Sequence, residues 1–462
     1  IVMLFFSEET RGVMQWGSGS LVQDSWRDTL GLLWRIAVAA MLTAFLIKPL
    51  NIMSLGDTQA ESAGIPVKKI RLLSLAVAAF LSAGVVGFVG MMGFVGLAAA
   101  TLVRQMGVRT LSMRLICSFI VGALLLMLTD NGLMLLKHYR GTDLPAGAVT
   151  ALVGAPLLLW LTAKAPPRPS FQTTSDISTA APHVPRLLRF LPLITVAVSV
   201  LAFTVGRYDE TLRLTIDPEY FVFRYPRVLL AAATGTMLAL TGVILQRLTQ
   251  NPMAGPELLG ISSGTAFGAM SVVMLFGITS GSGWFWLTGI VSALVSLGLL
   301  MLFNRKNGFT PEKILLTGMV LAALADAAIR IWMATGDFRV QLLLLWMSGS
   351  TYQATPESAL TVGLLAAASL LLILTLQRWL GLLSLNPTIA RSVGINVPLA
   401  RLVLIVSSAA LTALSTLLIG PLSFVGLLAP HLARMLGARL PKQQLAAAAL
   451  IGASVMMTAD WL

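Results

Sequence analysis

The sequence predicts an all-α, polytopic membrane protein that contains two related units in tandem. Of its 462 residues, 56% are hydrophobic and only 11% are charged, whereas soluble domains carry about 25% charged residues. Many segments reach the roughly 20 apolar residues that a helix needs to cross a bilayer. Two long segments also repeat one another at a separation of 330 positions, which indicates an internal duplication.

We predict about fourteen membrane helices, several of them shorter than a full crossing. The expected helices of the first half are 29–47, 71–90, 93–106, 112–130 and 145–163. Those of the second half are 189–206, 227–247, 257–277, 284–304, 313–334, 357–377, 401–420, 424–437 and 442–461. Residues 164–186 are rich in Pro, Ser and Thr, a composition typical of a linker between domains.

The repeat defines the expected units. Over 51–110 and 381–440, 23 of 60 aligned residues are identical without a gap. In this register residue 1 corresponds to Ile331, so 1–163 is expected to be the C-terminal half of a first unit. The region 187–462 is then a second unit that lacks its last helix. Because about ten spans, an even number, separate equivalent points, the two units are expected to have parallel topology.

The basic residues predict which connections face the cytoplasm. The formal net charge of +13 comes from Lys and Arg scattered between spans, a pattern typical of positive-inside topology rather than of nucleic-acid binding. This rule places the linker and both copies of the repeated polar loop in the cytoplasm. Cys117 is the single cysteine and the three histidines are far apart, so the sequence predicts no bound metal or other cofactor.

A polar loop occurs twice, as Leu50–Arg71 and Leu380–Arg401. The second copy is the longest polar interruption between two apolar spans in the second half of the chain. In each copy a small residue four positions before a glycine predicts a short helix followed by a turn. These pairs are Ala60 with Gly64 and Ala390 with Gly394. The alternative is a solvated connector between spans. Such a connector would not require the same residues in both copies. Since the second copy has Arg391 and no acidic residue, the two loops are expected to differ in charge.

The segment RYPRVLLAAATGTMLALTGVILQRLTQNPMAGPELLGISSGTAFG, residues 224–268, has the most specific pattern in the chain. Gly235 and Gly242 are seven positions apart and therefore lie on one helix face, where they permit close helix packing. Asn251 and Pro252 end that helix. A tightly packed helical hairpin would explain the glycines equally well.

As a whole, this segment resembles the signature of the FecCD-type permeases. These are the membrane subunits of ABC importers for iron-siderophores, haem and vitamin B12. The segments GPLSFVGLLAPHLARMLG (420–437) and DLPAGAVTALVGAPLLLWL (143–161) resemble two further family motifs. The resemblance covers nearly the whole chain and implies a multi-pass protein of the bacterial inner membrane. Two units fused in one chain are most similar to the importers of ferric hydroxamates, with vitamin B12, haem and catecholate siderophores as alternatives.

The resemblance also implies sites for partners. Arg224 and Arg227 match the arginines that dock a periplasmic substrate-binding protein, although arginines at an interface also snorkel without a partner. Asn251, Pro252 and Met253 match an Asn-Pro-Leu segment associated with a cytoplasmic gate. The polar loops match the segments that carry coupling helices for two copies of an ABC ATPase. The residues expected to form these coupling loops are Ser54, Leu55, Ala60, Gly64, Ser384, Leu385, Ala390, Arg391 and Gly394.

The energy for transport is expected to come from outside the chain. No G-x-x-x-x-G-K-[ST] motif occurs, so we expect a permease that is not itself an enzyme, with ATP and Mg²⁺ used by a separate ATPase. The alternative is a secondary transporter driven by an ion gradient, which a parallel repeat and few intramembrane acids disfavour. Those acids are Asp130 and Asp460, together with Asp326, which we expect Arg330 to neutralise at i,i+4.

Overall fold

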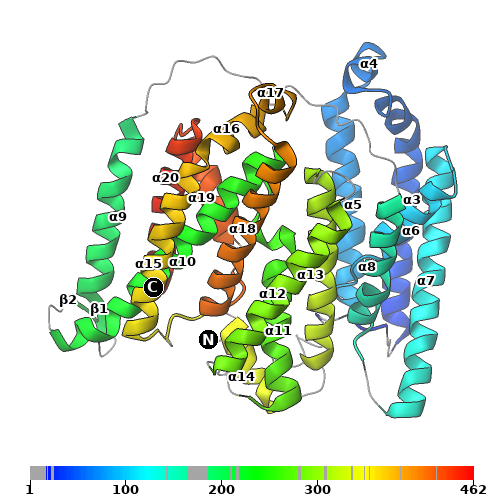
Figure 1. Cartoon of the computed structure of the whole chain (residues 1–462). Helices are drawn as coiled ribbons and strands as arrows, with labels where there is room; N and C mark the ends of the chain where they lie inside the picture. Colours follow the sequence, from blue (N-terminus) through cyan, green and yellow to red (C-terminus); the bar gives the residue numbers. More distant parts are fainter. Residues whose placement is uncertain are drawn as a thin grey trace. The chain divides into compact units, whose positions relative to one another are not determined.

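The computed structural model describes residues 17, 19–21, 25–141, 144–164, 186–208, 211–214, 218–278, 282–305, 310–333, 337–347, 349–352, 354–385, 387–422 and 424–462. Over these ranges the chain is almost entirely helical (Figure 1). Eight of the described helices are long and apolar enough to cross a membrane. The linker predicted at 164–186 lies almost wholly outside the described residues.

The chain divides into two compact units. The first comprises Ile1–Ala165 with Asp326–Gly336, and the second comprises Pro166–Ala325 with Asp337–Leu462. The helices of the first unit are α3 (Trp26–Met53), α4 (Asp57–Ser62), α5 (Val67–Val89), α6 (Val95–Gln105), α7 (Leu111–Arg140) and α8 (Ala146–Lys164). Ala39, Leu46 and Val77 form a small core between α3 and α5. Gln105 joins α6 to α8 because its Nε2 donates to the Leu161 carbonyl at 2.6 Å.

The second unit contains most of the helices and the larger core. It begins with α9 (Arg186–Thr204), β1 (Val205–Tyr208), β2 (Thr211–Leu214), α10 (Pro218–Thr249), the 3₁₀ helix η1 (Pro256–Leu259), α11 (Ile261–Phe276) and α12 (Gly283–Asn304). It continues with α13 (Pro311–Met333), whose end from Asp326 belongs to the first unit, α14 (Phe338–Met347) and α15 (Pro356–Thr375). Its last helices are α16 (Gln377–Leu385), α17 (Pro387–Ser392), α18 (Val397–Ile419), α19 (Phe424–Met435) and α20 (Pro441–Trp461).

Helix α10 is the centre of the second unit. Its most apolar window is 83% buried, more than the 61% of α18, the next most buried candidate span. It packs against α15, α18, α19 and α20. A Cβ atom added at Gly235 would collide with the Gly452 carbonyl of α20, and one at Gly242 would collide with the Gly426 carbonyl of α19. The close packing predicted for Gly235 and Gly242 is therefore confirmed.

The prediction of a purely α-helical chain is wrong at 205–214. There β1 and β2 form an antiparallel hairpin in which Val205 pairs with Leu214 and Gly206 with Arg213. In a strand of four residues, the alternation of apolar and polar residues is too short to distinguish the strand from the end of a neighbouring helix. The helices α14 and α16 were also not predicted, because each has ten residues or fewer and is too short to cross a membrane.

Segments 330 positions apart adopt the same local structure in the two units. The bounds of α4 and α5 differ from those of α17 and α18 by 330 at both ends. The glycines that end these elements share a left-handed backbone: φ is +79° at Gly64 and +84° at Gly394, and +79° at Gly90 and +98° at Gly420. Residues with a Cβ rarely adopt this conformation, which explains why glycine occurs in both copies.

We expect Gly242→Ala to destabilise the protein by about 1–3 kcal/mol, because even a methyl group there forces α10 away from α19. The matched control is Gly298→Ala in α12, where an added Cβ has no atom within 4 Å and should be neutral or mildly stabilising. Thermal unfolding of the solubilised protein measures both changes. Equal midpoints for the two variants would contradict the packing role of Gly242.

Candidate functional site

The second polar loop forms a short helix and a glycine turn, as predicted. The Ile395 N–H donates to the Ala390 carbonyl at 3.0 Å, and the Gly394 N–H donates to the Arg391 carbonyl at 2.9 Å. Ala390 is completely buried, whereas Leu385 is exposed. Helix α17 is therefore held in place through the one face that carries Ala390.

The first polar loop repeats this geometry. The Ile65 N–H donates to the Ala60 carbonyl at 3.0 Å, and Ala60 is completely buried, as is its counterpart in α17. The serine that precedes each short helix bonds back to the residue three positions earlier. The Ser54 Oγ donates to the Asn51 carbonyl at 2.6 Å, and the Ser384 Oγ donates to the Gly381 carbonyl at 2.8 Å.

The two loops differ in their polar side chains. In the first, the Arg71 Nη2 pairs with the Asp57 Oδ2 at 2.9 Å between two exposed side chains. Exposed pairs of this kind contribute about 0–1 kcal/mol, so this pair shapes the surface charge more than the stability. In the second loop, Pro387 occupies the position of Asp57, and the Asn396 Oδ1 caps α18 by accepting from the Leu399 N–H at 3.2 Å. The same backbone thus presents different charges, as predicted.

The predicted gate segment is a hydrogen-bonded turn that follows α10. The Met253 N–H donates to the Asn251 Oδ1 at 2.9 Å, and the Ala254 N–H donates to the Asn251 carbonyl at 3.1 Å. Pro252 and Met253 are exposed, whereas Ala254 is completely buried. An asparagine side chain that binds its own backbone two residues ahead is a common way to order such a turn.

A polar cluster of two buried glutamines and two arginines holds the adjoining end of α10. The Gln246 Nε2 donates to the Leu427 carbonyl at 3.0 Å, and its Oε1 accepts from the Arg434 Nη2 at 2.9 Å. The Arg247 Nε donates to the Gln444 Oε1 at 2.6 Å. The bond to Gln246 gives Arg434 a structural role at the helix end and ties α10 to α19, while Arg247 ties it to α20.

The predicted docking arginines lie near the other end of α10. The Arg224 Nη1 donates to the Phe203 carbonyl at 3.0 Å. The Arg227 Nη2 pairs with the Asp460 Oδ1 at 3.2 Å, and the same oxygen accepts a hydrogen bond from the Thr351 hydroxyl. Asp460 is nearly buried, whereas Arg227 keeps 39% of its side-chain surface exposed. Asp460, which the sequence predicted as an intramembrane acid, is therefore the partner of a predicted docking residue. The sequence did not reveal this pairing.

Two other predicted groups stay predictions. Arg330 donates through its Nη1 to the Gly17 carbonyl at 3.1 Å, and its neutralisation by Asp326 is not tested. Asp130 is half-buried in α7. No group of three or more His, Cys, Asp or Glu side chains is placed to hold a metal within the described ranges.

Glu257 is a titratable group that the sequence analysis missed. It lies in η1, directly after the gate turn, and its Oε2 is buried without a hydrogen-bond partner among the described residues. Burial raises the pKa of Glu257 above its ordinary value of 4.5, because the charged carboxylate loses its water. No residue pattern signalled this, since burial depends on how the chain packs around η1 and not on the residue itself.

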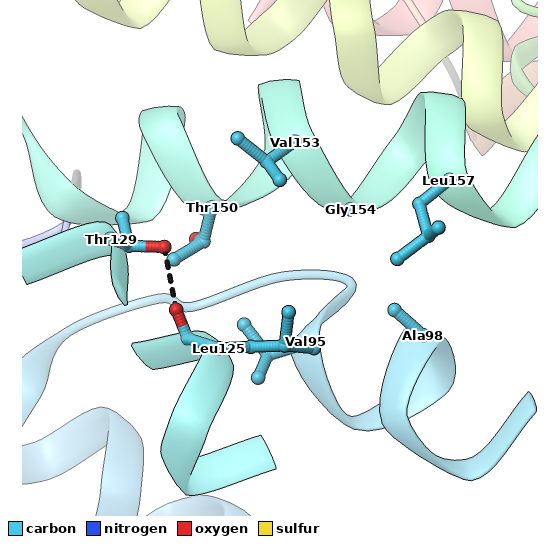
Figure 2. Close-up of a pocket in the computed structure, with 8 residues that line it drawn as sticks. All are labelled: Val95, Ala98, Leu125, Thr129, Thr150, Val153, Gly154 and Leu157. Atoms are coloured by element: carbon cyan, nitrogen blue, oxygen red, sulfur yellow. Dashed lines mark hydrogen bonds between the residues drawn. The ribbon is translucent and has the colours of Figure 1, made fainter. Parts of the chain in front are cut away.

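Figure 2 shows a small pocket in the first unit between α6, α7 and α8. Its volume is about 10 Å³, which is about the room that one water molecule needs. The Thr129 and Thr150 hydroxyls donate to the carbonyls of Leu125 and Gly147 in their own helices, at 2.8 and 2.9 Å. The pocket is a gap in helix packing and is far too small for an iron chelate.

The fold defines a multi-pass helical membrane protein. Residues 1–164 and 191–462 match the FecCD transport family, and the chain belongs to that family. It is 36% identical over 467 residues to the iron(3+)-hydroxamate import system permease proteins FhuB of Salmonella typhimurium (strain LT2) and Escherichia coli (strain K12). These alignments cover 100% of this chain and 68% and 70% of the two relatives. A solved structure of a metal-chelate type ABC transporter in an inward-facing conformation is 29% identical, with a TM-score of 0.53 over 60% of this chain and 89% of that one.

Because the pKa of Glu257 is raised in the folded protein, folding favours the protonated carboxyl. Its stabilising contribution is complete below the ordinary pKa of 4.5 and is lost as the pH rises through the folded pKa. We therefore expect Glu257→Gln to flatten the fall in unfolding temperature between about pH 4 and pH 8. The control is Glu357→Gln, which removes an exposed carboxylate. An unchanged pH profile in Glu257→Gln would contradict the burial of a neutral carboxyl.

Proposed function

We propose that this chain is the permease subunit of an ABC importer that moves a ferric hydroxamate siderophore into the cytoplasm across the bacterial inner membrane. The observation that carries the proposal is the alignment of the whole chain with two iron(3+)-hydroxamate import permeases at 36% identity. The family match supports transport as the activity. Vitamin B12, haem and catecholate siderophores remain the alternative substrates.

The proposed architecture is two tandem units of parallel topology, each of about ten membrane helices when complete. Support comes from the shared bounds of α4 and α17 and of α5 and α18, together with the 23 identities in 60 aligned residues. The proposed boundaries are 1–163, the cytoplasmic linker 164–186, and 187–462.

Energy would enter through α4 and α17 from two copies of a cytoplasmic ABC ATPase, which binds the ATP and Mg²⁺. The chain lacks a P-loop of its own, and we assign it no enzymatic activity and no bound cofactor. Exposed Leu55 and Leu385 and the exposed surfaces of both short helices are the proposed contacts. Exposed Arg391 of α17 belongs to these contacts. The remaining residues of the two loops position the helices: Ser54, Ala60, Gly64, Ser384, Ala390 and Gly394.

On the periplasmic side, Arg224 and Arg227 are the proposed docking residues for the substrate-binding protein. Arginine suits this role because it stays charged and pairs with carboxylates through two parallel hydrogen bonds. Arg227 already pairs with Asp460, so a carboxylate of the binding protein would join or replace that partner. On the cytoplasmic side, Asn251, Pro252 and Met253 are the proposed gate, with Met253 as the apolar barrier.

The decisive experiment is uptake of radioactive ferric hydroxamate into proteoliposomes that contain the complete permease, its ATPase and the binding protein. We expect uptake to require ATP and to be unaffected by a proton gradient. Uptake driven by a proton gradient with ATP withheld would replace this proposal with a secondary transporter. Competition by haem, a corrinoid or a catecholate chelate tests the choice of substrate in the same vesicles.

The coupling role of α17 predicts that Ala390→Phe abolishes co-purification of the ATPase, because Ala390 has no exposed surface and a phenyl ring would displace the short helix. The matched control is Ala367→Phe on an exposed position of α15, which should leave the complex intact. Retention of the ATPase by a stably folded Ala390→Phe variant would remove α17 from the interface.

A further inference from the structure

We propose that Gln250 is a positioning residue that links the coupling segment, α16 with α17, to the gate turn Asn251–Ala254. This inference rests on the proposed function and adds a route by which movement of the coupling segment reaches the gate. The Gln250 Nε2 donates to the Ser384 carbonyl at 2.8 Å, across 134 positions of sequence. One bond thus joins the residue that follows α10 to the end of α16.

The backbone of Gln250 gives a second, independent indication. Its φ is +52°, and among the described residues it shares a positive φ outside glycine with Phe94. At the ends of α7 and α11 this left-handed position is occupied by Gly141 and Gly277, which adopt it without a steric penalty. A glutamine in the same position carries the steric penalty of its Cβ but adds a side chain that can form hydrogen bonds. Glycine could not form the bond to the Ser384 carbonyl, so this bond is what the glutamine contributes.

On the gate side, Gln250 is continuous with an ordered turn. The Asn251 N–H donates to the Thr249 Oγ1 at 3.3 Å, which adds to the bonds that Asn251 accepts from Met253 and Ala254. The turn is therefore one hydrogen-bonded piece that begins at the residue bound to Ser384. A displacement of Gln250 moves Met253, which is 62% exposed.

On the coupling side, Ser384 is firmly connected as well. Its Oγ donates to the Gly381 carbonyl at 2.8 Å, and Leu380 and Leu383 of α16 are buried in the main core. The completely buried Ala390 anchors α17 immediately downstream. Because α17 begins at Pro387, three residues after Ser384, movement of α17 by the ATPase would reach the Ser384 carbonyl over a short stretch of chain.

A hydrogen bond adds something that packing does not. Helix α16 also contacts α10, so pressure from the coupling segment can pass through side-chain contact alone. Side-chain contact is not directional and allows sliding, whereas the hydrogen bond ties the Gln250 side chain to one particular carbonyl oxygen. The bonds of Gln246 and Arg247 hold α10 to α19 and α20 instead. We therefore assign to Gln250 the step in which the coupling segment draws the gate turn away from its resting position.

The test uses Gln250→Glu in the complete permease with its ATPase and binding protein. Glutamate has the same shape, but an ionised carboxylate has no hydrogen to donate to the Ser384 carbonyl. We expect ATP hydrolysis to continue while the ferric hydroxamate transported per ATP falls about fivefold or more, the lower end of typical coupling between sites. Gln250→Gly removes the same bond and relieves the backbone, so it should uncouple transport without lowering the unfolding temperature. Gln443→Glu in α20 is the control for the added charge.

Each outcome is decisive. A transport-to-ATP ratio equal to that of the unaltered protein in both Gln250 variants would overturn the inference and leave the proposed function intact. Loss of the ATPase or a lower unfolding temperature in Gln250→Gly would show that the bond serves assembly rather than coupling, and would also overturn it. Absence of ATP-driven uptake by the unaltered protein would instead contradict the proposed function, on which the inference depends. Stimulation of ATP hydrolysis by the binding protein gives a readout that is independent of uptake.

Discussion

The arrangement of the second unit depends on the close approach of α10 to α19 and α20. Within lipid, helices gain no hydrophobic stabilisation from one another, so van der Waals packing and interhelical hydrogen bonds must hold them together. Gly235 and Gly242 allow this because the backbones of Gly452 and Gly426 occupy the space that a Cβ would need. Small residues on both helices are required, and both sides supply glycine. A central helix held in this way fixes the position of everything attached to its two ends.

The polar groups at those ends determine the rotation of α10 about its axis. Gln246 and Arg247 bond to α19 and α20 at one end, and Arg227 bonds to Asp460 of α20 at the other. Such groups are expensive to bury without partners, so each bond restricts the helix to the orientation that satisfies it. The gate turn begins just beyond the last of these bonds. The residues before the turn are therefore held in place by hydrogen bonds, while the turn itself can move with the coupling segment.

The two polar loops show which properties of a duplicated element are constrained. Backbone geometry is the same in α4 and α17 because a buried alanine and a left-handed glycine recur in both copies. Surface charge differs between the copies. Where the first copy has the Asp57–Arg71 ion pair, the second has Pro387 and Arg401 at the corresponding positions. The buried alanine and the turn glycine hold each short helix in place within its own unit, whereas the exposed charges are not constrained in this way. In the proposed importer, identical ATPase subunits would meet the same shape with different electrostatics.

The sequence by itself determined the membrane class, the positions of the eight described helices that are long enough to span, the short helix and turn in each polar loop, and the glycine face of α10. These features depend on local composition and on helical periodicity, which a linear pattern records. Only the tertiary structure decided which polar residues meet: Arg227 with Asp460, Arg434 with Gln246, and Gln250 with Ser384. Their partners lie 233, 188 and 134 positions away, beyond the reach of any i,i+4 rule. The same holds for the pKa of Glu257, because burial is a property of the packed helices and not of the residue.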